Sequence, residues 1–221
     1  MKSAVILVLI AASVFAETYI YKEVTGGRES SHIYTISKRR DGYFVRRIHE
    51  MAAETTDIEE ITTDTNFATL TWRFVEPSES TELWGRRTGT KITVRGIHKK
   101  VPVCRTFTID GRPWMQTFAL NLEGFLKAPI TSSEFWALGA FKPGEIKIAD
   151  FAALKKERTS VSVAGRNCTA QRVRVSLTGI RSSLWHGNYF HDLDSGAYIR
   201  YEGVNGPPGT PPTKIELVAV R

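Results

Sequence analysis

The chain has 221 residues, of which 42% are hydrophobic and 24% are charged. These fractions exclude an intrinsically disordered chain, and a count of 2 cysteines excludes a disulfide-dense scaffold. The net charge of +7 comes from basic runs that are scattered along the chain, which is typical of a solvated surface, so we expect no nucleic-acid partner. These runs are 38–40, 46–47, 86–87, 99–100 and 155–156.

The first 16 residues have the pattern of a secretory signal peptide. Lys2 supplies the positive end, residues 4–12 are almost wholly apolar, and Val14 and Ala16 occupy the −3 and −1 positions of a cleavage site. The apolar run is shorter than the roughly 20 residues that span a bilayer. We therefore expect cleavage after Ala16, a single mature domain over residues 17–221 without a transmembrane segment, and a periplasmic or secreted location.

Alternation of apolar and polar residues with a period of two dominates the mature chain and predicts β-strands. It is clearest over 67–75, where Leu70, Trp72 and Phe74 share one face. Asp41-Gly42 separates two such runs and predicts a tight hairpin with positive φ at both residues. The expected strands are 19–24, 31–38, 43–50, 57–63, 67–75, 81–87, 91–97, 101–109, 160–164, 171–177, 183–190, 197–201 and 214–220.

The middle of the chain, 117–158, breaks this alternation. Residues 132–138 begin with serines and end before Gly139, which predicts a short helix, and 149–156 form a second candidate. The whole pattern predicts a mainly β protein: an antiparallel meander curled into a barrel or half-barrel, with one or two short helices in the middle insert. A solid core and a ligand-sized interior are both compatible with it.

Cys104 lies in the expected strand 101–109 and Cys168 lies just before the expected strand 171–177, and both are out of phase with the apolar residues of these strands. Export would place them where disulfides persist. Two interpretations stay open: a disulfide that closes a long loop, or two free thiols too far apart to meet.

The densest polar and aromatic segment contains His186, His191, Asp192 and Asp194. These four are candidate metal ligands, because imidazole and carboxylate groups suit zinc and similar ions. The spacing Asp192-x-Asp194 also resembles a fragment of a calcium loop, without its distant glutamate.

The simplest interpretation of the same segment is a hairpin turn over 192–196, whose aspartates accept hydrogen bonds from backbone amides. Nothing in the sequence fixes a base beside a nucleophile, so we assign no catalytic residue and expect no cofactor.

Aromatic residues offer a third candidate site. Trp72, Trp84, Trp136 and Trp185 could line an apolar cavity that holds an acyl chain or another apolar ligand. The alternative is that these side chains pack in the core and on the sheet.

Several short segments of the C-terminal half carry a family likeness: 133–138, 161–165, 170–175, 185–196 and 199–203. They resemble uncharacterised bacterial exported β-rich proteins that are grouped as domains of unknown function. The resemblance implies a curved antiparallel sheet or open barrel, reminiscent of periplasmic lipoprotein carriers. Its motifs are structural, and the resemblance implies no catalytic residue.

The leading hypothesis is therefore an exported, non-enzymatic binding or envelope-associated protein. Its ligand would be an apolar or anionic amphiphile, such as a lipid, lying on the concave aromatic face with basic residues at the rim. One alternative is a hydrolase that uses the 186–194 segment. Another is a structural or protein-interaction module that presents an exposed strand edge. The sequence leaves the oligomeric state and the identity of the ligand open.

Overall fold

The computed structural model describes residues 16–52, 54–204 and 209–221, and the expected signal peptide lies outside this part of the chain except for Ala16. The described residues form 14 strands, one α-helix and two short 3-10 turns. The elements are β1 (Ala16–Thr25), β2 (Arg28–Arg39), β3 (Gly42–Met51), β4 (Glu54–Thr63), β5 (Thr69–Glu76), η1 (Pro77–Glu79), β6 (Thr81–Thr88), β7 (Lys91–His98), β8 (Val101–Thr108), α1 (Phe118–Lys127), β9 (Ser132–Ala140), β10 (Ile146–Val163), β11 (Arg166–Leu177), η2 (Gly179–Ser183), β12 (His186–Asp192), β13 (Tyr198–Val204) and β14 (Pro212–Val220).

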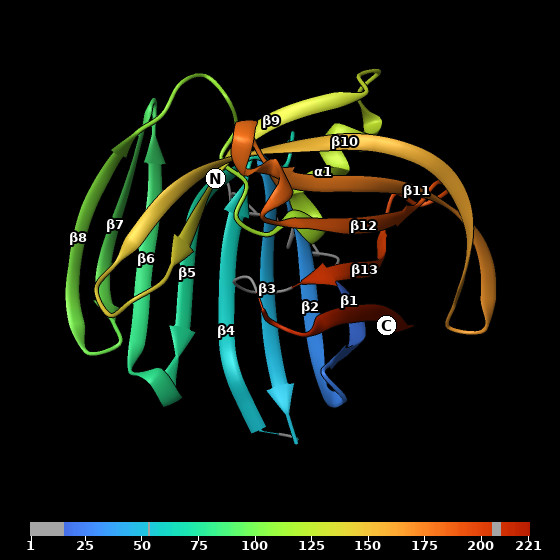
Figure 1. Cartoon of the computed structure of the whole chain (residues 1–221), viewed down its shortest axis with the longest axis horizontal. Coiled ribbons are helices and arrows are strands. Elements are labelled where there is room, and N and C mark those ends of the chain that lie inside the picture. The colour runs from blue at the N-terminus through green and yellow to red at the C-terminus, as the bar shows by residue number, and fades with distance from the viewer. Residues whose placement is uncertain (1–15, 53, 205–208) are drawn as a thin grey trace, which may run out of the picture.

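All 14 strands belong to one antiparallel sheet, in the order β8-β7-β6-β5-β4-β3-β2-β1-β14-β13-β12-β11-β10-β9. Consecutive strands are neighbours except at one place, where β14 pairs with β1 and joins the two halves of the chain. In Figure 1, β1–β8 run from top to bottom and β9–β13 run across them, so the sheet curls back on itself. The predicted class, a mainly β meander curled into a barrel-like shape, is confirmed.

The two sheet edges, β8 and β9, do not pair with each other, and the seam between them is crossed by the segments next to them. The backbones of Trp114 and Trp136 form an isolated bridge, and the Gly144 amide donates to the His98 carbonyl at 3.2 Å. An apolar cluster fills the space between the edges. It includes Ile61, Trp72, Leu83, Ile92, Val94, Val103, Trp114, Leu138 and Ile146. The barrel is therefore open in its hydrogen bonding but packed at its seam.

Helix α1 fills the interior between the two halves of the sheet. Leu122 and Phe125 pack among buried residues of β9–β11, while Leu120 packs against Val45 and Phe67. Because this side of the interior is solid, the open space lies beyond the N-terminal end of the helix. In the described part of the chain, no helix has the length and apolar character needed to cross a membrane.

The two helices predicted from the sequence do not form at the predicted positions. Residues 132–138 lie in β9 and 149–156 lie in β10, and these two strands pair with each other over nine residue pairs from Ile146↔Ala140 to Leu154↔Ser132. Pairing with a neighbouring strand overrides a local helix signal of this length. The helix lies over Phe118–Lys127 instead, where the side chain of Thr117 makes no capping hydrogen bond.

The predicted β2–β3 hairpin is confirmed, but its turn is one residue earlier than expected. Arg39 pairs with Gly42, so Arg40 and Asp41 are the turn residues. Gly42 has a φ of +146°, and a Cβ atom there would lie 1.9 Å from the carbonyl oxygen of Thr63. Glycine is needed at this position because β4 approaches the backbone closely.

Replacing Gly42 by alanine tests this close approach. We expect Gly42→Ala to lower the free energy of unfolding by more than about 2 kcal/mol, since the backbone of β3 or β4 must move. Gly27→Ala is the control: Gly27 also has positive φ, at +81°, but a Cβ there meets nothing within 4 Å. Its cost should be about 1 kcal/mol. Equal losses in urea unfolding would contradict the steric argument.

Candidate functional site

Two rows of polar side chains cross the inner face of β2–β4. In one row His32 is opposite His49, and His49 is opposite Asp57. In the next row Arg47 is opposite Glu59. Side chains two residues apart on a strand share a face, so the register alone places these groups together on the concave side.

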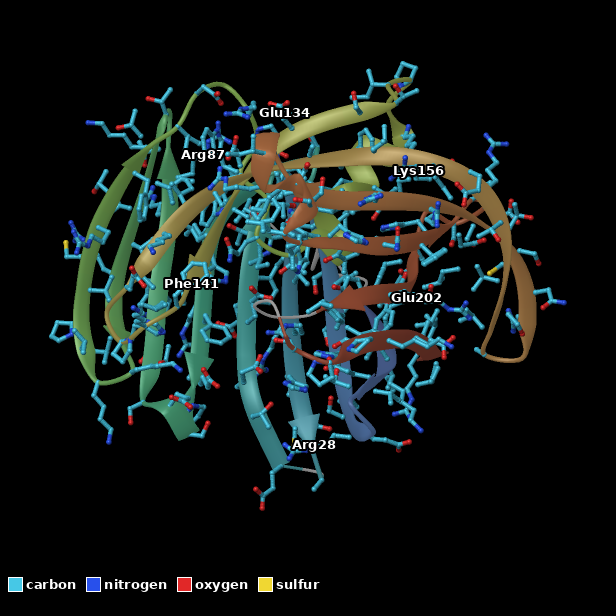
Figure 2. The ribbon with its side chains drawn as sticks, viewed as in Figure 1. Arg28, Arg87, Glu134, Phe141, Lys156 and Glu202 are labelled. Atoms are coloured by element: carbon cyan, nitrogen blue, oxygen red, sulfur yellow. The ribbon has the colours of Figure 1, made fainter. Side chains whose placement is uncertain are left out.

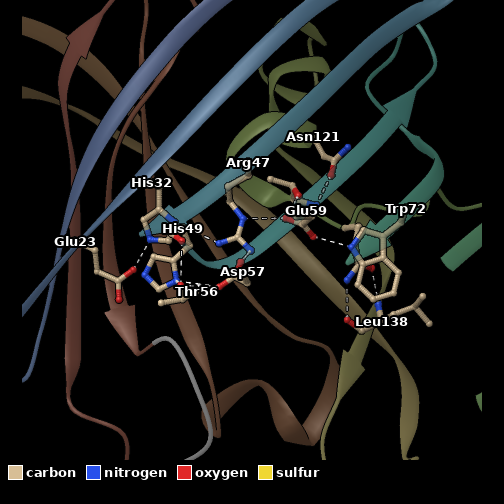
Figure 3. A network of polar contacts seen from close by, with 12 residues as sticks. Glu23, His32, Arg47, His49, Thr56, Asp57, Glu59, Trp72, Asn121 and Leu138 are labelled. Carbon is tan, nitrogen blue, oxygen red and sulfur yellow. Dashed lines mark hydrogen bonds and ion pairs between the residues drawn. The ribbon is translucent and has the colours of Figure 1, made fainter. Parts of the chain in front are cut away.

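Arg47 lies at the centre of this network (Figure 3). Its Nη2 donates to Asp57 Oδ1 at 2.6 Å and its Nε donates to Glu59 Oε2 at 3.2 Å. Burial alone lowers the pKa of Arg47, but the nearby Glu59, Tyr34 and Asp57 outweigh it and raise the pKa. The guanidinium is therefore charged, although the Arg47 side chain is only 16% exposed.

Glu59 connects the network to the core and to the helix. Its Oε1 accepts a hydrogen bond from Trp72 Nε1 at 2.8 Å, and its Oε2 accepts one from Thr117 Oγ1 at 2.9 Å. Thr117 immediately precedes α1. Together with the bond from Arg47, these contacts satisfy a carboxylate that would otherwise be costly to bury.

His32 and Glu23 form the second part of the network. His32 Nε2 lies 2.5 Å from Glu23 Oε2, and Arg47 Nη1 lies 3.3 Å from His32 Nδ1. Because arginine can only donate, Nδ1 accepts and Nε2 carries the proton. Burial lowers the pKa of His32, which is neutral at pH 7. Burial alone raises the pKa of Glu23, but hydrogen bonds from His32 and Thr25 outweigh it and lower the pKa.

His49 completes the network. Its ring stacks on His32 with centroids 4.4 Å apart, and its Nδ1 lies 2.9 Å from Asp57 Oδ2. Burial alone raises the pKa of Asp57, but the hydrogen bond from His49 and the charge of Arg47 outweigh it and lower the pKa. The Nε2 atom of His49 is buried and has no hydrogen-bond partner among the described residues. Glu23, His32 and His49 are thus the residues of this site that could hold a metal ion.

The network forms one wall of a cleft of about 640 Å³. The opposite wall is aromatic and comes from the start of α1, η2–β12 and β13. It consists of Phe118, Trp185, Tyr189, Tyr198 and Tyr201. Tyr189 lies at the centre of this wall, because the centroid of its ring is 5.9 Å from that of Phe118 and 5.0 Å from that of Tyr201.

Of the four tryptophans predicted to bind a ligand, Trp185 lines this cleft. Trp72 is buried in the cluster at the seam. Trp84 is on the outer face, 52% exposed and covered in part by the Arg73 guanidinium. Trp136 is half-buried and donates to Asp110. Trp72 and Trp84 line a separate pocket of about 630 Å³, so the four tryptophans do not meet in one cavity.

The structure does not bring together the four predicted metal ligands on β12 and its turn. His186 is exposed, whereas His191 is 1% exposed and its Nδ1 lies 3.2 Å from the Gly196 carbonyl. Asp192 accepts hydrogen bonds from the amide and hydroxyl of Ser195, and Asp194 is exposed. This is the hairpin turn of the simplest interpretation, and it supports neither a metal site nor a hydrolase centre in this segment.

Cys104 and Cys168 are free cysteines, on β8 and β11. These strands lie on opposite sides of the molecule (Figure 1), so the structure has the unpaired thiols and not the disulfide.

The basic runs lie on separate strands and turns, as shown by Arg87 on β6 and Lys156 on β10 (Figure 2), and Lys99 and Lys100 form the β7–β8 turn. Arg47 was wrongly grouped with this solvated surface, because it points into the cleft.

The sequence analysis missed the network, although a signal for it exists. Arg47 and His49 continue the face of Val45, and Asp57 and Glu59 continue the face of Ile61. Charged residues that fall in phase with buried positions of a strand indicate a polar interior. The alternation of apolar and polar residues alone does not distinguish them from residues on the solvated face.

No family model and no curated protein matches the sequence. Among solved structures, the chain is similar to a β-barrel-like protein of the domain of unknown function DUF1849 from Brucella abortus, with a TM-score of 0.60 and 12% identity over 94% of this chain and 97% of that one. It also matches the hypothetical lipoprotein YmcC from Escherichia coli K12, with a TM-score of 0.45 and 11% identity over 94% and 88%. The first likeness shows the fold alone. The fold is that of barrel-like proteins of unknown function, as the resemblance in the sequence implied.

Removing the central cation tests how much the network depends on it. Arg47→Met should lower the free energy of unfolding by about 3–5 kcal/mol, because Asp57 and Glu59 are left buried without a counter-charge. Arg73→Met is the control, since Arg73 also bridges two carboxylates, Glu60 and Glu82, but on the solvent-exposed face. Its cost should be below about 1 kcal/mol. If chemical denaturation shows that both variants lose the same free energy of unfolding, the network is not buried.

A second prediction concerns acid stability. Burial lowers the pKa of His191 to about 4, against about 6.5 in an unfolded chain. Between these values the unfolded chain takes up a proton that the folded chain does not, so stability is full above pH 6.5 and is lost as the pH falls toward 4.

The contribution of His191 to this loss should be about 2–3 kcal/mol between pH 7 and pH 4.5. His191→Asn should therefore lose that much less stability over the same interval, as measured by urea unfolding at both pH values. His186→Asn, which removes an exposed imidazole of the same strand, is the control. If His191→Asn and the unmodified protein lose the same free energy of unfolding between the two pH values, His191 is not a buried neutral imidazole.

Proposed function

We propose that this chain is an exported, non-enzymatic binding protein whose ligand lies in the cleft between the polar network and the aromatic wall. The observation that carries the proposal is the two-sided lining of the cleft. An aromatic surface that faces a few fixed polar groups is the usual construction of a site for a small organic molecule.

The aromatic wall supplies contact area for an apolar group. Burial raises the pKa of Tyr189 and Tyr198 well above its usual value, so both phenols are neutral. Trp185 Nε1 and the Tyr201 hydroxyl both donate to the carbonyl of Val204, at 2.7 and 3.0 Å. These bonds hold the rings in place, which reduces the entropy lost when a ligand binds.

The charge of the opposite wall determines which polar group fits. Glu23, Asp57 and Glu59 face one guanidinium, that of Arg47. The excess of carboxylates disfavours the anionic head group expected from the basic composition. We therefore propose an amphiphile with a cationic or hydrogen-bond-donating head.

Export is part of the proposal. It is supported by the pattern of residues 1–16, with a basic end, an apolar run and small residues before Glu17. The binding protein would then act in the periplasm or outside the cell.

The test uses the neutral dye N-phenyl-1-naphthylamine as a reporter of the cleft. The dye should gain fluorescence with the protein, and dodecyltrimethylammonium should displace it at lower concentration than dodecyl sulfate below their micelle concentrations. Trp185→Ala should weaken dye binding about tenfold, which corresponds to about 1.4 kcal/mol.

Phe141→Ala is the matched control, because Phe141 is a 57% exposed aromatic side chain that lines neither this cleft nor the pocket beside Trp84. Circular dichroism establishes that both variants fold. The proposal fails if the dye does not bind, if dodecyl sulfate competes better, or if the Phe141 variant loses as much affinity as the Trp185 variant.

A further inference from the structure

Three donor groups converge at the polar end of the cleft. One atom from each of Glu23, His32 and His49 lies within 4.8 Å of the other two. Within the part of the chain that the structure describes, this is the one group of at least three histidine, cysteine or acidic side chains with ligand atoms so close. The three come from adjacent strands β1, β2 and β3, so the sheet itself fixes their spacing.

The free nitrogen of His49 points to a ligand that the protein does not itself provide. Asp57 and the Thr56 hydroxyl lie 2.9 and 2.8 Å from Nδ1, which leaves Nε2 buried and without a partner among the described residues. A carboxylate that orients a histidine through its second nitrogen is the usual support for a metal-binding imidazole, because it fixes the tautomer and makes the free nitrogen more basic.

The charge of the network favours a divalent ion. Three carboxylates, of Glu23, Asp57 and Glu59, are opposed by the single guanidinium of Arg47. The side chains of Glu23 and His32 are only 11% and 6% exposed. An excess of two negative charges in a buried site is costly unless a cation compensates it.

We propose that Glu23, His32 and His49 bind one divalent transition-metal ion, with Asp57 as the positioning residue of His49. Two imidazoles and one carboxylate are a donor set that zinc takes readily, whereas magnesium and calcium prefer oxygen ligands alone. Three protein ligands would leave a fourth position open toward the cleft.

Binding requires the stack of the two imidazoles to open, because rings that lie 9° from parallel with centroids 4.4 Å apart cannot both point a nitrogen at one ion. His32 is the ring that turns, since Asp57 holds His49 in place. Ligand atoms of a tetrahedral zinc ion at about 2.0–2.1 Å lie roughly 3.3 Å apart, so the 2.5 Å contact between His32 and Glu23 must lengthen. The proton on His32 Nε2 moves to Nδ1, with no net change in protonation. Arg47 then withdraws from Nδ1, where its contact is 3.3 Å, and keeps its bonds to Asp57 and Glu59.

The first experiment needs no variant. Untagged full-length protein is treated with EDTA, dialysed against Zn²⁺ at pH 7.5 and analysed for bound metal by mass spectrometry. We expect one zinc ion per chain and a higher thermal unfolding midpoint when zinc is bound. With Co²⁺ in place of zinc, we expect the intense visible bands of a tetrahedral site and no thiolate charge-transfer bands. Less than stoichiometric zinc, or bands of a cobalt–thiolate bond from Cys104 or Cys168, would overturn the proposal.

Variants assign the ligands. His49→Gln and Glu23→Gln should each weaken zinc binding at least 100-fold, and Asp57→Asn should weaken it about 10–100-fold. His186→Gln removes an exposed histidine of β12 and should bind zinc as the unmodified protein does. Circular dichroism checks the folding of each variant, and folded His49→Gln that binds zinc normally would contradict the assignment.

The two proposals rest on the same excess of carboxylates, so a bound zinc ion would remove the preference for a cationic head. The dye competition is therefore run on EDTA-treated protein, and zinc is measured without dye or detergent. A protein that binds the dye but no zinc would refute only the metal site. One that binds zinc but no dye would refute only the proposed function.

Discussion

The ion pair between Arg47 and its two carboxylates is the constraint on which the rest of the site depends. It links β3 to β4, and through Glu59 it reaches Trp72 on β5 and Thr117 at the start of the helix. A charge buried with only one partner is unstable, so each member of this set holds the others in place. The cleft has a fixed polar wall because these bonds are made together.

The curvature of the sheet explains why such a network can lie inside the protein. On either side of the network's inner end the face of the sheet is apolar: Val45 packs with Leu120 of α1, Ile61 packs in the cluster at the seam, and each is 1% exposed. Two residues further along the same strands, beyond the helix, the side chains are Arg47 and Glu59. The helix therefore divides the concave face into a packed core and a cleft, and Glu59 lies at the boundary.

Much of the fold could be predicted from the sequence, because one-sided burial leaves a period of two in almost every strand. Two features could not be. Residues 132–138 and 149–156 become strands through mutual pairing, which no local pattern contains. The site depends on the register between strands. His32, His49 and Asp57 are separated along the chain by 8 to 25 residues and become neighbours only when β2, β3 and β4 align. The sequence predicted a site in 186–194 because the polar residues of this segment are close together in sequence. Adjacent residues of a strand point to opposite faces, so closeness in sequence does not bring their side chains together.

The protonation of the two stacked imidazoles is the most direct test of this account, since the network determines which nitrogen of each ring carries a proton. Nitrogen-detected NMR of the histidine side chains at neutral pH, in the metal-free protein, reads this directly. The account predicts a proton on Nε2 of His32, facing Glu23, and on Nδ1 of His49, facing Asp57. The opposite tautomers, or rings that exchange freely between both forms, would contradict it.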